Sequence, residues 1–95
     1  MRLSEYQRNS ITASFRSMFP EHLLYLFGSR TDDSQKGGDI DLLILGDTRL
    51  TMKEIRIFKI DLYKKIGEQK IDIISYAKDD NETFKELILN EAVPI

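Results

Sequence analysis

The chain has 95 residues, 41% of them hydrophobic, with 14 lysines and arginines against 16 aspartates and glutamates, giving a formal net charge of −2. This length suits one compact domain, which we expect over residues 1–95, and leaves no room in it for a second core. The absence of cysteine excludes a disulfide framework and any thiolate metal site. It also fits a reducing compartment, and we expect the protein in the cytoplasm.

Charge and hydropathy argue against two classes of partner. No apolar stretch approaches the roughly 20 residues that cross a bilayer, and the N-terminus lacks the basic and apolar regions of a secretory leader. We therefore expect no membrane partner. The nearly balanced charge does not favour direct binding to a nucleic-acid backbone, which would need a local basic patch.

Apolar spacing predicts a first helix over residues 4–19, followed by a short strand. Ser4 suits the N-cap of the helix, and Pro20 is suited to end it. Its apolar residues recur at helical spacing: Ile11, Phe15, Met18 and Phe19. The apolar run over residues 22–28 predicts a central strand, with His22 as a residue at its edge. The glycine-rich polar stretch over residues 28–38 predicts a loop with room for a helical turn.

The second predicted strand, residues 39–46, carries two acids in an apolar context. Alternation places Ile40, Leu42 and Ile44 on one face. The opposite face receives Asp39, Asp41, Leu43 and Leu45. Both faces are therefore expected to be covered, except where the two carboxylates lie.

The rest of the chain predicts a helix, a strand and a last helix. Thr51 and Glu54 have capping-box spacing, and Gly67 is suited to end the helix that they begin. Its predicted apolar stripe comprises Met52, Ile55, Phe58, Leu62 and Ile66. A third strand is expected over residues 69–76.

A last helix is expected over residues 80–93, capped by Asp80 or Asn81, with Phe84, Leu87, Ile88 and Glu91 at helical spacing. The predicted fold class is α/β (α+β), with a small three-stranded sheet that can be mixed and about four helices.

The two acids of the second strand indicate a cation site. Asp39 and Asp41 leave the same face of a strand about 7 Å apart, so their charges repel, and burial increases the cost. A hard divalent cation such as Mg²⁺ removes both penalties. Asp72, in "IDIIS", becomes a third ligand or a base if its strand pairs in suitable register. The alternatives are solvated acids at a turn for the first two, and a charge that blocks aggregation for Asp72.

A phosphate-binding segment is expected beside these acids. Gly28 follows directly on the first strand, where a glycine lets the backbone approach a ligand closely. Ser29 offers a hydroxyl and an N–H, and Arg30 adds a fixed positive charge for phosphate oxygens. A phosphate cradle next to a metal site is the arrangement that phosphoryl-type transfer needs.

The motif "FGSR", with nine residues from Arg30 to Gly38 between Ser29 and Asp39, is followed by "DID" and then by a strand with a lone aspartate. This order resembles the DNA polymerase β-type nucleotidyltransferase superfamily. The short length resembles the minimal nucleotidyltransferases (MNT), the antitoxin partners of HEPN-domain toxins. The resemblance implies that Gly28 and Ser29 bind the triphosphate of ATP and that Asp39 and Asp41 bind two Mg²⁺ ions. It implies that Asp72 helps to bind metal and activates the acceptor hydroxyl.

The sequence also departs from that pattern. Asp32 and Asp33 stand where many relatives have an arginine and a glycine, and Gly38 stands where a serine is common. Two added acids weaken triphosphate binding unless Lys36 or a partner supplies positive charge.

The resemblance implies transfer of AMP from ATP to a tyrosine of a HEPN toxin, with the two proteins assembling as a toxin–antitoxin pair. So small a domain leaves little surface for choosing an acceptor, which independently favours a protein as acceptor. Two alternatives stay open: an antitoxin that neutralises its partner by binding alone, and a small-molecule nucleotidyltransferase. Nucleotide preference, acceptor residue and oligomeric state are not determined by the sequence.

Overall fold

The computed structural model describes residues 3–28 and 39–95. The helices in this part of the chain are α1 (Glu5–Met18), α2 (Met52–Ile66) and α3 (Thr83–Glu91). The strands are β1 (Leu23–Phe27), β2 (Ile40–Gly46), β3 (Ile71–Ala77) and β4 (Val93–Pro94). The strands form one sheet in the order β3-β2-β1-β4, with β2 and β3 parallel and the other pairs antiparallel. The predicted α+β class is confirmed, and the sheet is mixed.

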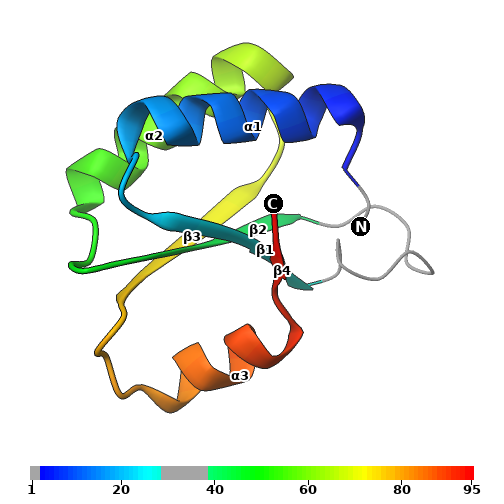
Figure 1. Ribbon diagram of the computed structural model, residues 1–95. Helices are drawn as coiled ribbons and strands as arrows, with labels where there is room; N and C mark the ends of the chain where they lie inside the picture. The colour runs from blue at the N-terminus through cyan, green and yellow to red at the C-terminus, as the bar shows by residue number, and fades with distance from the viewer. Residues whose placement is uncertain (1–2, 29–38) are drawn as a thin grey trace.

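The sheet separates two helical layers. Helices α1 and α2 cover one face, and α3 covers the other (Figure 1). Ile40, Leu42 and Ile44 pack toward α1 and α2, whereas Leu43 and Leu45 pack with Ile88 of α3. The alternation predicted for the second strand is therefore confirmed, with apolar side chains buried on both faces.

The sheet has four strands rather than the predicted three. The additional strand, β4, pairs with β1 through Val93 opposite Leu26 and Pro94 opposite Tyr25. A two-residue strand leaves no alternating pattern in the sequence, and proline, which has no N–H to donate, is tolerated at a sheet edge. Three of the about four predicted helices are α1, α2 and α3. The remaining one was expected as a helical turn within residues 28–38, and residues 29–38 lie outside the described part of the chain.

The two long helices begin as their sequences predict. Ser4 caps α1 and Thr51 caps α2, each in a complete capping box, with Gln7 and Glu54 returning the hydrogen bond. Gly67 follows α2 at a φ of 85°, a left-handed conformation that favours glycine.

Parts of the two predicted apolar stripes do not reach the core. Met52 is 80% exposed because it is the first residue of α2 and lies at the margin of the packed layer. Phe84 and Leu87 are also exposed, since α3 turns mainly Ile88 and Leu89 toward the sheet. Both helices therefore bury a narrower stripe than the spacing suggests.

The predicted cap of α3 was wrong. The N-cap residue is Glu82, and its side chain makes no capping hydrogen bond. The carboxylate of Asp80 is instead occupied by the Arg49 guanidinium, at 2.7 Å, and by the backbone N–H of Ala77, at 2.9 Å. An acid with these two partners is not available to cap the helix.

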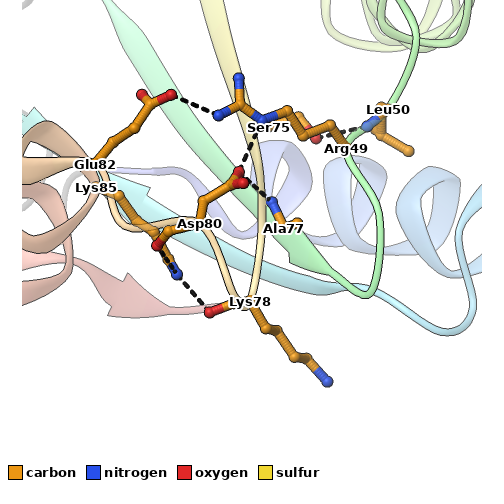
Figure 2. Close-up of polar contacts among 8 residues, drawn as sticks. All are labelled: Arg49, Leu50, Ser75, Ala77, Lys78, Asp80, Glu82 and Lys85. Atoms are coloured by element: carbon orange, nitrogen blue, oxygen red, sulfur yellow. Dashed lines mark hydrogen bonds and ion pairs between the residues drawn. The ribbon is translucent and has the colours of Figure 1, made fainter.

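Asp80 belongs to a group that joins the loops after β2 and β3, which we call the loop clamp: Arg49, Asp80, Glu82 and Lys85 (Figure 2). Arg49 also bonds Glu82 at 2.6 Å. Lys85 is 6% exposed and donates to the backbone oxygens of Lys78, at 2.6 Å, and Asp80, at 3.0 Å. The clamp fixes the carboxyl-terminal ends of β2 and β3, opposite to the ends that carry the candidate site.

In the part of the chain that the structure describes, no helix combines the length and the apolar character that a bilayer-spanning segment needs.

Candidate active site

The parallel pairing of β2 and β3 brings the predicted carboxylates together. Asp41 lies directly opposite Asp72 in the register of the two strands, and Asp39 precedes Asp41 by two residues. Residues opposite each other in neighbouring strands, and residues two apart in one strand, project from the same face. The suitable register that the sequence required is therefore present, and the three aspartates lie at one end of the sheet.

Electrostatic repulsion is concentrated on Asp41. Partial burial raises the pKa of its carboxyl above the usual 3.8, and the negative charges of Asp72 and Asp39 raise it further. A side-chain hydrogen bond between Asp41 and Asp72 acts in the same direction, because it needs a proton on one of the two carboxyl groups. The pair thus carries negative charge that the surrounding protein does not fully compensate.

Lys70 lies beside the third aspartate. Its Nζ is 3.4 Å from Asp39 Oδ2, and the two side chains are 70% and 42% exposed. The hydrogen bond with Asp39 raises the pKa of the Lys70 ammonium, and the charges of Asp39, Asp72 and Asp41 add to this effect. Lys70 was not predicted as a site residue, although its position directly before β3 and two residues before Asp72 favours the same side of the sheet.

Gly28 follows β1 and lies directly against Asp41. Its φ of 76° lies in the left-handed region, and a β-carbon built on it would overlap Asp41 Oδ2. Glycine is thus needed here for two reasons, the backbone conformation and the space taken by the carboxylate. We expected this glycine to permit approach to a ligand, and the structure shows that it permits approach to Asp41.

Several predicted residues lie outside the described part of the chain. These are Ser29 and Arg30 of the expected phosphate segment, together with Asp32, Asp33, Lys36 and Gly38.

The donor set fits a hard divalent cation. The three aspartates offer the carboxylate oxygens that Mg²⁺ prefers, and a cation would relieve the repulsion that raises the pKa of Asp41. Within residues 3–28 and 39–95, however, no three acidic or histidine side chains already stand as a group that could hold a metal ion. The carboxylates would have to close around the cation, and the metal-ligand roles of these residues stay a prediction.

His22 lies at the other end of the sheet. Its ring packs edge-on against Phe19, with centroids 5.9 Å apart, and a β-carbon built on Gly46 would overlap it. This environment fits the predicted role at the edge of the strand rather than a role beside the aspartates.

Most of the chain matches the model of one protein family. The model described as polymerase beta, nucleotidyltransferase, matches residues 9–95. The chain belongs to this nucleotidyltransferase family. The resemblance inferred from "FGSR" and "DID" is thereby confirmed, whereas a search of curated protein sequences gave no significant match.

Solved structures of toxin–antitoxin complexes share the fold. One contains a tri-AMPylated HEPN toxin of Shewanella oneidensis with its MNT antitoxin, with a TM-score of 0.69, 19% identity and coverage of 93% of this chain and 67% of that chain. Another toxin–antitoxin structure contains AMP-PNP, with a TM-score of 0.73, 20% identity and coverage of 90% and 69%. A mutant MntA–HpeT complex has a TM-score of 0.72 and 17% identity, and the match covers 90% of this chain and 69% of that chain. These likenesses confirm the nucleotidyltransferase fold.

Proposed function

We propose that this protein is a Mg²⁺-dependent nucleotidyltransferase that transfers AMP from ATP to a tyrosine hydroxyl of a HEPN-domain toxin, and so acts as the antitoxin. The observation that carries the proposal is the register that sets Asp41 opposite Asp72, with Asp39 and Gly28 beside them, in a member of the nucleotidyltransferase family. The neighbouring structures support the substrates, since one holds an AMPylated toxin and another holds AMP-PNP.

Each residue has a proposed role in the transfer. Asp39 and Asp41 hold the divalent cation, which supplies neutralisation of the charge on the phosphates. Gly28, Ser29 and Arg30 bind the triphosphate. Asp72 accepts the proton of the acceptor hydroxyl.

The reaction is a nucleotidyl transfer to oxygen. The hydroxyl oxygen forms a bond to the α-phosphorus, the bond from that phosphorus to the bridging oxygen breaks, and pyrophosphate leaves. Asp72 takes up the proton that the hydroxyl loses, whereas Asp39 and Asp41 make or break no covalent bond and contribute position and charge.

Radiolabelled ATP tests the reaction class. The protein would be incubated with a HEPN-domain partner, Mg²⁺ and ATP labelled at either the α- or the γ-phosphate. Label is expected to enter the partner from the α-labelled nucleotide alone, and the Asp39→Ala, Asp41→Ala variant should transfer none. Transfer of the γ-label would show a kinase, and transfer of neither label would contradict the proposal.

A second function is favoured by one feature of the sequence. Asp32 and Asp33 add negative charge to the expected triphosphate segment, which weakens nucleotide binding and favours an antitoxin that acts by binding alone. Growth rescue separates the two functions. If transfer is the mechanism, the Asp39→Ala, Asp41→Ala variant binds the toxin without restoring growth, whereas a binding-only antitoxin restores it.

A further inference from the structure

Two similar lysine–aspartate pairs lie at opposite ends of the same two strands. Lys70, directly before β3, faces Asp39, directly before β2, with 3.4 Å between Nζ and Oδ2. Lys78, directly after β3, faces Asp47, directly after β2, with 3.9 Å between Nζ and Oδ1. All four side chains are substantially exposed, but only the first pair adjoins the Asp41–Asp72 pair.

The Lys70–Asp39 pair differs from the Lys78–Asp47 pair because it lies among further carboxylates. Three carboxylates at one end of the sheet repel one another, and the Lys70 ammonium supplies positive charge among them. A lysine ammonium is a compact charge on a flexible stem, and an exposed ion pair is held by little free energy. Lys70 can therefore stabilise the cluster and still leave it readily.

We propose that Lys70 is a displaceable counter-ion that occupies the cation position at Asp39 until a divalent cation replaces it. A metal ion bound to Asp39 would share its carboxylate with the Lys70 ammonium, and two cations that close together repel each other. Lys70 consequently lowers the affinity of the site for a free divalent cation. This inference rests on the proposed function, which assigns Asp39 to the metal.

Titration with Mn²⁺, followed by the electron paramagnetic resonance signal of the free ion, measures this competition without any catalytic turnover. The wild type would be compared with Lys70→Met, Lys70→Arg and the matched control Lys78→Met. Because an exposed pair is worth up to about 1 kcal/mol in general, Lys70→Met should bind Mn²⁺ about three- to fivefold more tightly. Lys70→Arg, which retains the charge, and Lys78→Met should resemble the wild type.

Asp39→Asn shows whether the effect passes through the aspartate. In that background Lys70→Met should no longer change Mn²⁺ affinity, because the competing oxygen has lost its charge. Circular dichroism spectra of all variants would verify that these surface substitutions leave the fold intact.

The outcomes separate the inference from the function on which it rests. Equal affinity of wild type and Lys70→Met, with weaker binding by Asp39→Asn, would overturn the role of Lys70 and leave the metal site standing. Equal tightening by Lys78→Met would also overturn it, since the effect would then be one of net charge. Absence of binding by every protein, Lys70→Met included, would overturn both the inference and the metal site.

Discussion

Asp41 and Asp72 lie directly opposite each other in the parallel pairing of β2 and β3, and the pKa of Asp41 is raised by burial and by the charges of Asp72 and Asp39. A sheet selected for stability alone would not place two acids in this relation, because like charges opposite each other destabilise a strand pair. The arrangement costs folding free energy, and the divalent cation that we propose for this site would neutralise it.

Asp41→Asn should stabilise the metal-free protein at neutral pH. The raised pKa means that ionisation of Asp41 opposes folding, and this penalty is complete above the raised pKa and absent below 3.8, the usual value. Because water screens part of the repulsion at a partly buried group, we expect a gain in unfolding free energy of no more than about 1 kcal/mol. Urea unfolding at about pH 7 and about pH 3 measures it, since the gain should vanish at the lower pH.

The control for this prediction is Asp47→Asn, at a side chain that is 94% exposed. It should leave the unfolding free energy nearly unchanged at both pH values. A gain of equal size in the control, or an Asp41→Asn variant less stable than the wild type at neutral pH, would refute the electrostatic explanation.

Gly28→Ala should damage the site more than the fold. Gly28 and Gly67 both have a positive φ, so alanine at either position is strained, by about 1 kcal/mol. Only at Gly28 does the added carbon meet a side chain, that of Asp41, whereas nothing lies within 4 Å at Gly67. Both variants should lose stability in thermal unfolding, but only Gly28→Ala should lose Mn²⁺ binding. Unimpaired binding by Gly28→Ala would show that Asp41 is not held where the structure has it.

Lys85→Met should destabilise the fold without touching the site. Lys85 is 6% exposed, and its loss leaves the backbone oxygens of Lys78 and Asp80 without this donor. We expect a loss of about 1–3 kcal/mol in unfolding free energy, measured by urea denaturation. Lys53→Met, on the exposed side of α2, serves as the control and should change it by less than about 0.5 kcal/mol. A neutral Lys85→Met would mean that the two hydrogen bonds of Lys85 add nothing to stability.

Local features of the fold could be predicted because they depend on neighbours in sequence. The N-cap of α1, the capping box of α2 and the alternation along β2 follow from residues close together in the sequence, and all three are confirmed. The cap of α3 could not be predicted, since Asp80 is bound by Arg49, 31 positions earlier in the chain. Likewise β4 depends on β1, far away in sequence, for its pairing.

For the candidate site, too, the residue types could be predicted from the sequence, whereas their spatial arrangement could not. Residue type and strand context predicted Asp39, Asp41 and Asp72 as site residues. Their proximity, however, depends on the register of β2 and β3, which only the folded sheet supplies. The role of Lys70 could not be assigned before Asp39 was known to lie beside it. Gly28 was singled out as a point of close backbone approach, and the group that it approaches in the structure is Asp41, while its nucleotide-binding role stays a prediction.

Asp72→Asn should slow transfer without preventing nucleotide binding. As the proposed acceptor of the hydroxyl proton, Asp72 is expected to contribute about a hundredfold or more to the rate. Single-turnover transfer to the HEPN partner at saturating ATP measures the rate, and calorimetric titration with a non-hydrolysable ATP analogue measures binding. A transfer rate within a few-fold of the wild type would remove Asp72 from the role of base.

The central claim, that this protein adenylylates a HEPN-domain toxin through the aspartates of β2 and β3, is tested most directly by the intact mass of the toxin. The toxin would be purified from cells that co-express it with the wild type or with the Asp39→Ala, Asp41→Ala variant. We predict a mass increase of one or more AMP units with the wild type and none with the variant. An unmodified toxin that is bound and silenced equally by both proteins would contradict the claim.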